Sequence, residues 1–248
     1  MKSWLTKVGK LPLGVAMACG GFFLLSAADW QILSAVALAA VAIAAWELGG
    51  LLGRPVGQRL VLAGAVALAG PLSLWLLAGR REAYDEFFAF VLAFWVAVVP
   101  LWMLMKPKLP KPALAASGAV VLICAWLGVT LLAEYDRLLL ILGLVAVWLV
   151  DTAGWFFGNK FGNRPLAAQI SPNKTWEGLV GGLFTVYVFV TFCWFLAGRL
   201  HPHWVAVLLG AALCALAVLG DLAESQLKRI AKVKDSSGLL GSHGGLLD

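Results

Sequence analysis

Long apolar stretches, separated by short breaks that carry charge, recur along most of this chain of 248 residues. A helix needs about 20 mostly apolar residues to cross the hydrocarbon core of a bilayer. Hydrophobic residues make up 62% of the sequence and charged residues 13%, which is more apolar surface than a soluble domain could bury. We therefore expect an all-α, polytopic transmembrane helical bundle that forms a single integral membrane domain over residues 1–248. Eight candidate spans are Leu11–Ala28, Trp30–Leu52, Leu60–Gly79, Phe87–Met105, Ala113–Ala133, Leu138–Phe157, Leu179–Ala197 and His203–Gly220.

The distribution of charge predicts the orientation of these spans. If the N-terminus is cytoplasmic, fifteen of the nineteen Lys and Arg residues fall in cytoplasmic segments, as the positive-inside rule requires. The net charge of +6 is explained by these loops, so we expect no nucleic acid partner. The two most polar segments, Gly158–Gly178 and Asp221–Asp248, then lie on the same cytoplasmic side and can contribute to one site.

The second of these segments combines acidic, basic and small residues. If the helix of the last span continues, Asp221, Ser225 and Lys228 share one face by their i, i+4, i+7 spacing. Mg²⁺ prefers oxygen ligands and usually takes one or two carboxylates from the protein. We select Asp221 and Asp248 as its ligands.

Cations in the same segment suit a phosphate-bearing substrate. Arg can bind a phosphate through two parallel hydrogen bonds, and Lys can attract it as a point charge. These cations are Lys228, Arg229 and Lys234, and Gly244 and Gly245 would let the backbone approach a phosphate. A basic tail can also be a plain anchor on anionic lipid heads. An anchor has no need for the acidic residues mixed into it, which include Glu224.

The other polar segment offers buried charge and helix-capping residues. Asp151 lies inside its span, where an ionised carboxylate is costly unless it is partnered or snorkels to the interface. Ser171, followed by Pro172, fits the start of a helix, although Thr175 could cap the following span instead. Lys174 is a cation near a helix N-terminus, a position that a bound anion would favour. Glu47, in the second span, is a further buried charge.

These residues resemble the phosphatidate cytidylyltransferase family, also called CDP-diglyceride synthases. The family motif reads Ser-x-x-Lys-Arg, four residues, Lys-Asp, then His-Gly-Gly and Asp. It matches Ser225, Lys228, Arg229, Lys234, Asp235, His243, Gly244, Gly245 and Asp248 with every spacing kept. The run Ile170–Gly178 resembles the family's Ser-Pro-x-Lys-Thr-x-Glu-Gly segment, and Trp46-Glu47 its second-span Trp-Glu. The chain departs from the family pattern in two places. The aromatic residue after Asp151 is displaced by one position. The family also carries a further hydrophobic stretch beyond the position of Asp248, which implies a possible ninth span.

The resemblance implies transfer of CMP from CTP to phosphatidate, giving CDP-diacylglycerol and pyrophosphate with Mg²⁺, in phospholipid biosynthesis. Residues 1–133 would then supply N-terminal spans, and residues 134–248 the catalytic spans and cytoplasmic loops. Metal ligands would be Asp221 and Asp248, and catalytic residues Ser225, Lys228, Arg229, Asp235 and His243. Substrate-binding residues would be Ser171, Asn173, Lys174, Thr175, Lys234, Gly244 and Gly245, with Asp151, Glu47, Glu177 and Glu224 as additional candidates.

Other functions are separable by sequence or by product. A membrane transporter would show inverted repeats and broken helices, which we do not find. An alcohol phosphotransferase would show an Asp-Gly-x-x-Ala-Arg run, which is absent from the sequence. A CTP-dependent lipid kinase differs by releasing CDP. We expect CTP, phosphatidate and membrane lipid as partners at the bacterial inner membrane, and a homodimer stays open.

Overall fold

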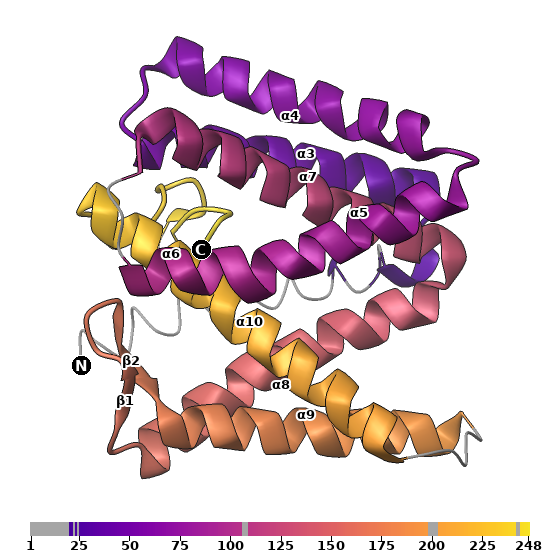
Figure 1. The fold of residues 1–248 in the computed structure, drawn as a ribbon, viewed down its shortest axis with the longest axis vertical. Helices are drawn as coiled ribbons and strands as arrows, with labels where there is room; N and C mark the ends of the chain where they lie inside the picture. The colour runs from indigo at the N-terminus through magenta and orange to yellow at the C-terminus, as the bar shows by residue number, and fades with distance from the viewer. Residues whose placement is uncertain (1–19, 22, 24, 106–108, 198–202, 242–243) are drawn as a thin grey trace. The chain divides into compact units, whose positions relative to one another are not determined.

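The computed structural model describes residues 20–21, 23, 25–105, 109–197, 203–241 and 244–248 (Figure 1). Within these ranges, seven helices are long and apolar enough to cross a membrane, and they coincide with every predicted span after the first. The first predicted span, Leu11–Ala28, falls mostly outside the described residues. The prediction of an all-α polytopic bundle is confirmed for the part of the chain that the structure describes.

The helices differ from the predicted spans mainly at their ends. α8 reaches Phe161 and α10 reaches Ala231, whereas the sequence placed these ends at Phe157 and Gly220. In chain order the elements are α3 (Trp30–Leu51), α4 (Val56–Leu77), α5 (Arg81–Ala93), the π-helical turn η1 (Phe94–Val98), α6 (Val99–Met105), α7 (Lys111–Tyr135), α8 (Arg137–Phe161), β1 (Pro165–Ala167), β2 (Ser171–Thr175), α9 (Trp176–Leu196) and α10 (His203–Ala231).

Local residues explain several of these ends. Pro55 and Pro110 stand in extended conformation directly before α4 and α7, because proline cannot donate a hydrogen bond inside a helix but is tolerated at its start. Gly53 adopts a φ of +67° in the turn between α3 and α4, and Lys232 adopts a φ of +58° directly after α10. A left-handed residue stops a helix because it turns the chain away from the helix axis.

The chain divides into two compact units, which we describe one at a time. Unit 1 comprises Met1–Phe87, Lys108–Leu140 and Ala231–Asp248, and unit 2 comprises Phe88–Pro107 and Ile141–Ile230. The sequence-based division into residues 1–133 and 134–248 stays a prediction.

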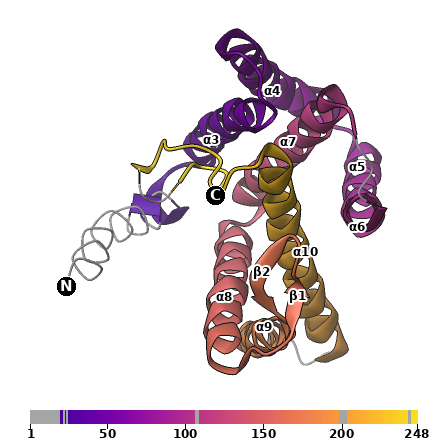
Figure 2. The same ribbon diagram turned by 90° about the vertical axis from the view of Figure 1, so that its left-hand side faces the viewer.

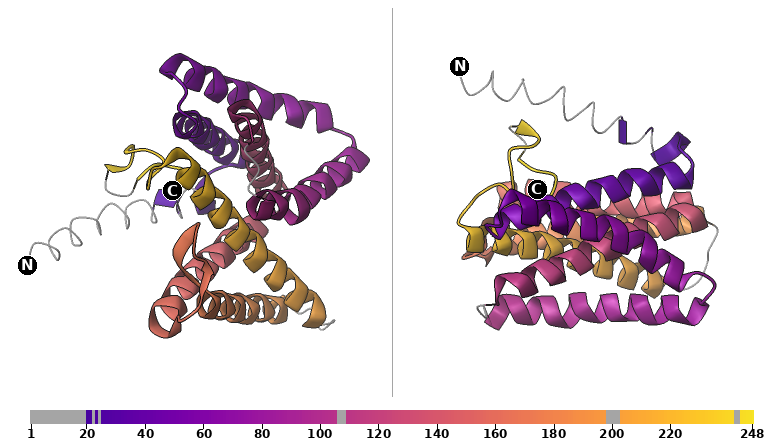
Figure 3. Two further views of the ribbon diagram at one scale, coloured as in Figure 1. Left: turned by 60° about the vertical axis from the view of Figure 1, so that its left-hand side comes forward. Right: turned by 90° about the horizontal axis from the view of Figure 1, so that it is seen from above.

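In unit 1, α3, α4 and α7 pack side by side (Figures 1 and 3). The indole Nε1 of Trp126, on α7, donates to the backbone oxygen of Ser34, on α3, at 2.9 Å. The hydroxyl oxygens of Ser34 and Thr130 lie 2.9 Å apart, and both side chains are buried. Hydrogen bonds between apolar helices resist breaking in a membrane, since the hydrocarbon offers their polar groups no other partner. They fix α3 against α7.

In unit 2, glycines bring α8 and α9 together. Gly154 and Gly158 stand four residues apart on α8, and a Cβ atom on Gly178 of α9 would lie 2.6 Å from the Gly154 carbonyl oxygen. Small residues at such spacing let membrane helices approach closely. Further along, side chains from α8, α9 and α10 form a buried cluster of Ala146, Val150, Val186, Val190 and Cys214.

A short hairpin between α8 and α9 is the one departure from an all-helical fold in the described residues. β1 and β2 pair antiparallel, with Pro165 opposite Thr175 and Ala167 opposite Ser171 (Figure 2). Ser171 therefore does not begin a helix, and the alternative cap is the correct one, because the Thr175 hydroxyl accepts a hydrogen bond from the Gly178 amide at 3.1 Å. Pro172 is tolerated in β2 because both strands are edge strands.

Candidate active site

An ion pair in unit 2 joins the hairpin to α10. Lys174, on β2, contacts the carboxylate of Asp221, on α10, and the two side chains are 24% and 39% exposed. α10 continues through this region without a break, as the shared face of Asp221, Ser225 and Lys228 requires. The expected meeting of Lys174 with Asp221 is thus observed.

Asp151 belongs to the same group. It lies on α8 and interacts electrostatically with both Lys174 and Asp221. Two carboxylates from two helices therefore share one lysine that the hairpin supplies. The carboxylate of Asp151, expected to need a partner inside its span, has a cation in its surroundings.

The next two turns of α10 carry two further basic residues. The ammonium of Lys228 forms an ion pair with Glu224, one helical turn earlier, at 2.8 Å. Arg229 donates from Nε to the backbone oxygen of Ile170, in the turn between the two strands, at 3.1 Å. That bond uses one of the five N–H groups of the guanidinium. The end of α10 is therefore attached to the hairpin at two points, through Arg229 and through Asp221.

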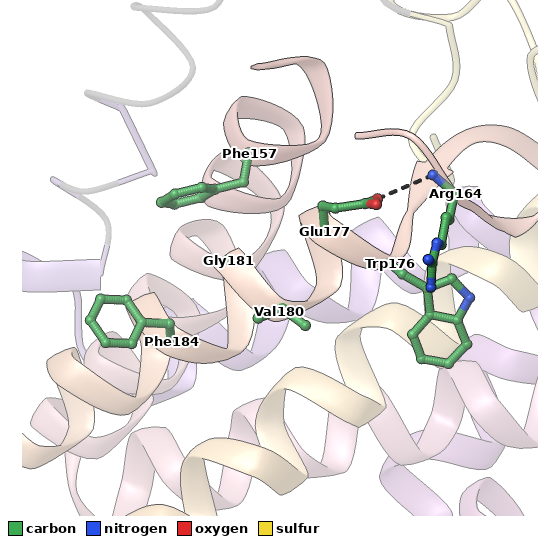
Figure 4. Close-up of a pocket in the computed structure, with 7 residues that line it drawn as sticks. All are labelled: Phe157, Arg164, Trp176, Glu177, Val180, Gly181 and Phe184. Atoms are coloured by element: carbon green, nitrogen blue, oxygen red, sulfur yellow. Dashed lines mark hydrogen bonds between the residues drawn. The ribbon is translucent and has the colours of Figure 1, made fainter. Parts of the chain in front are cut away.

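An apolar groove of about 490 Å³ lies at the start of α9 (Figure 4). At one end of it, Glu177 accepts a hydrogen bond from the backbone amide of Arg164 at 3.3 Å. Five of the seven lining residues are apolar, so the lining suits hydrocarbon better than a triphosphate. The lining residues are Phe157, Arg164, Trp176, Glu177, Val180, Gly181 and Phe184.

In unit 1, the carboxylate of Glu47 is fully buried and holds the C-terminal segment. One carboxylate oxygen accepts from the Ser237 hydroxyl at 2.6 Å and the Leu246 amide at 3.0 Å. The other accepts from the Leu247 amide at 2.8 Å and lies 3.2 Å from the Ser236 hydroxyl, whose single hydrogen it shares with Asp248. Four donors around one buried carboxylate offset the cost of taking its charge out of water.

Asp248 is held by the same segment. Its Oδ2 accepts from the amide of Ser236 at 2.8 Å, from the hydroxyl of Ser236 at 2.8 Å and from the amide of Gly245 at 2.7 Å. The two glycines make room for these carboxylates. A Cβ atom on Gly244 would lie 2.6 Å from Asp248 Oδ2, and one on Gly245 would lie 2.5 Å from Glu47 Oε1.

The predicted site residues fall into these two groups. Lys174, Asp221, Asp151, Glu224 and Lys228 lie in unit 2, whereas Glu47, Asp248 and the two glycines lie in unit 1. A shared role of Asp221 and Asp248 stays a prediction, as do the roles of the remaining predicted residues. Ser225 is half-buried on α10, Asn173 is exposed on β2, Lys234 and Asp235 are exposed in the tail, and His243 lies outside the described residues.

Two contributors were missed from the sequence, Ser236 and Ser237. The sequence signal that could have identified them is a pair of hydroxyl residues directly after Lys234-Asp235. The buried carboxylate of Glu47, in the second span, requires such hydrogen-bond donors. Arg59 was missed too. Its guanidinium lies 3.4 Å from the ring centroid of Trp46, and its Nε donates to the Trp46 oxygen at 3.1 Å, beside Glu47.

The fold and these groups define a polytopic helical membrane protein whose helices carry carboxylates paired with cations. Over residues 11–248 the sequence matches the model of the cytidylyltransferase family. This chain belongs to that family.

Curated relatives agree with the family match. The chain is 34% identical over 241 residues to a phosphatidate cytidylyltransferase of Pseudomonas aeruginosa, covering 94% of this chain and 86% of that protein. It is 41% identical over 114 residues to one of Haemophilus influenzae and 38% identical over 115 residues to one of Bacillus subtilis. These shorter matches cover 44% and 46% of this chain, and 40% and 43% of the relatives.

Proposed function

We propose that this chain transfers CMP from CTP to phosphatidate, giving CDP-diacylglycerol and pyrophosphate in phospholipid biosynthesis. The observation that carries the proposal is the ion pair of Lys174 with Asp221, next to Asp151. It joins the motif segment Ile170–Gly178 to Asp221, one helical turn before the tail motif that begins at Ser225. Family membership and the names of the relatives support the same reaction.

The chemistry asks for positioning and charge neutralisation. A phosphate oxygen of phosphatidate attacks the α-phosphorus of CTP, the bond from that phosphorus to the bridging oxygen breaks, and pyrophosphate leaves with the electron pair. The phosphate monoester is already anionic near neutral pH, so no strong general base is needed. Lys174 and Lys228 are each held by a carboxylate. We assign them, with Arg229, to the phosphates.

Mg²⁺ is part of the proposal. When bound, the ion would neutralise charge on the triphosphate. The described residues contain no group of three or more His, Cys, Asp and Glu side chains that could hold a metal ion. This fits Mg²⁺, which commonly takes one or two carboxylates and completes its shell with water and phosphate oxygens. We propose Asp221 and Asp248 as protein ligands.

The remaining assignments complete the proposal. Ser225, Asp235 and His243 would position the reactants, while Ser171, Asn173, Thr175 and Lys234 would contact substrate. Gly244 and Gly245 act through the close backbone approach that they permit. We place these residues on the cytoplasmic side of a bacterial inner membrane, with the N-terminus on the same side.

The decisive experiment follows the label of CTP. Purified protein in detergent receives phosphatidate, Mg²⁺ and CTP labelled at the α-phosphorus, and we expect label in the lipid together with free pyrophosphate. Asp221→Asn removes a charge from the Lys174 pair and should lower product formation by about 100-fold or more. Asp85→Asn, on α5, serves as the matched control with unchanged rate.

Two results would contradict this function. Release of CDP, with the γ-phosphate of CTP appearing in the lipid, would identify a lipid kinase. Retained activity in folded Asp221→Asn would remove Asp221 from the reaction. Folding of the variant is checked by gel filtration and by its circular dichroism spectrum.

A further inference from the structure

Glu47 has an unusual position for a carboxylate in an apolar helix. It lies on α3, its side chain is 0% exposed, and all four of its described donors come from the segment after α10. A buried charge that only stabilised α3 would be expected to pair within the helix bundle. The contacts of Glu47 instead join residues about 190 to 200 positions apart in the sequence.

The same donors lead from Glu47 to Asp248. The Ser236 hydroxyl lies within hydrogen-bonding distance of Glu47 Oε2 and of Asp248 Oδ2, at 3.2 and 2.8 Å. The amides of Leu246 and Leu247, bound to Glu47, directly follow Gly245, whose amide is bound to Asp248. Holding one carboxylate therefore fixes the backbone that holds the other.

The packing around this network leaves no room for a side chain at Gly245. A Cβ atom on Gly245 would collide with the Ser236 hydroxyl and lie 2.7 Å from the carboxyl carbon of Glu47. On the other side, Arg59 lies over Trp46 and binds its carbonyl oxygen, which fixes the end of α3 next to Glu47. The network thus connects the end of α3 to a tail in which the described residues 232–240 and 244–248 form no helix or strand.

We propose that Glu47 is a positioning residue that holds the described part of the tail loop, residues 236–241 and 244–248, in one conformation and thereby sets the place of the Asp248 carboxylate. Glu47 itself contacts neither substrate nor metal in this role. The part of this inference that concerns catalysis rests on the proposed function, because it treats Asp248 as a Mg²⁺ ligand. The holding of the tail loop does not depend on it.

Glu47→Gln tests the holding directly. Each oxygen of Glu47 accepts from one backbone amide, Leu246 or Leu247. A glutamine amide group cannot accept a hydrogen bond through its nitrogen, so either orientation of the side chain sets N–H against N–H. Since hydrogen bonds to a charged group contribute about 1.5–3 kcal/mol, we expect hydrogen exchange in the tail loop to speed up by about 10- to 100-fold.

Hydrogen–deuterium exchange followed by mass spectrometry of the whole protein in detergent gives the readout. Peptides from residues 236–248 should exchange faster in Glu47→Gln, while peptides from α7 and α9 stay unchanged. Ser237→Ala removes one donor from the loop side and leaves α3 intact, so it should raise exchange in the same peptides by a smaller factor. Glu134→Gln, an exposed carboxyl on α7, is the matched control and should behave as the unmodified chain.

A second readout separates positioning from simple support of the fold. We expect Glu47→Gln to raise the Mg²⁺ concentration for half-maximal CDP-lipid formation by about tenfold or more, with a smaller effect on the KM for phosphatidate. Unchanged exchange of the tail loop in both Glu47→Gln and Ser237→Ala would overturn the proposal. Faster exchange with an unchanged Mg²⁺ requirement would overturn its link to Asp248. If the unmodified protein forms no CDP-lipid, the proposed function fails, and the exchange data still decide the role of Glu47.

Discussion

Lys174 has two acidic neighbours and lies on β2, a strand of five residues. Its partner Asp221 and the nearby Asp151 stand on different helices of unit 2. Without this lysine, two like charges on neighbouring helices would repel each other without a cation between them. The lysine is therefore needed for the local fold as well as for the phosphates that we assign to it.

A double-mutant cycle measures this coupling. Lys174→Met should destabilise the protein more than Asp221→Asn, because it leaves two carboxylates without their shared cation. The combined variant should recover part of that loss, with an interaction energy of about 0.5–3 kcal/mol. Both side chains are partly exposed, which favours the lower end of that range. Unfolding in detergent, followed by circular dichroism, gives the four free energies, and strictly additive effects would contradict the coupling.

The α8–α9 pair shows how an element positions the site. Its glycines allow close helix packing, and the hairpin that carries Lys174 connects the two helices. Gly158 also leaves room for the capping hydroxyl of Thr175, since a Cβ atom there would lie 3.1 Å from it. The end of α8, the hairpin and the start of α9 therefore depend on one another.

Gly178→Val tests this dependence. The new side chain would meet the Gly154 carbonyl oxygen and should force α8 and α9 apart, at a cost of about 1–3 kcal/mol typical of overpacking. The matched control is Gly143→Val, on the partner helix α8, where no described atom beyond the local α8 backbone and the adjoining residues lies within 4 Å of a Cβ position. Thermal unfolding in detergent should show a lower Tm for Gly178→Val only. Equal values for the two variants would mean that the glycine contact is unimportant.

The sequence was sufficient to predict the elements that depend on local residue patterns. Apolar length defined the seven described spans, and the face shared by Asp221, Ser225 and Lys228 follows from helical spacing. The hairpin was not predicted, because strands of three and five residues containing proline carry too little periodicity to be recognised. The network of Glu47 with Ser236 and Ser237 was not predicted either. It joins residues far apart in the sequence, and no local pattern records which donors a buried carboxylate will meet.

The order of the spans along the chain predicts on which side of the membrane each connection lies. If each of the seven apolar helices crosses the membrane, we expect successive helices to run in opposite directions, which would put the connections after α3, α6 and α8 on one side. Five Lys and Arg residues lie in these connections and two more in the tail after α10, whereas Arg80 lies in a connection of the other side. The expected cytoplasmic location of the site depends on this assignment.

Cysteine labelling tests the orientation. With a maleimide that does not cross membranes, we expect Gln58→Cys to react only in inverted vesicles and Arg80→Cys only when the periplasmic face is accessible. The unmodified chain is the control, since its four cysteines lie in apolar stretches. Reversed labelling of the two variants would place the N-terminus, and with it the proposed site, outside the cytoplasm.

The buried contact of Ser34 with Thr130 has a consequence for Glu47 at the other end of the same helix. Thirteen residues of α3 separate Ser34 from Glu47, a rise of about 20 Å. A shift of α3 along α7 by one helical turn would leave the hydroxyls of Ser34 and Thr130 and the indole N–H of Trp126 without hydrogen-bond partners in the hydrocarbon. The position of Glu47 along the membrane normal is therefore set by the contacts of Ser34 with α7 at the other end of the helix. The fixed length of α3 between Ser34 and Glu47 transmits this constraint.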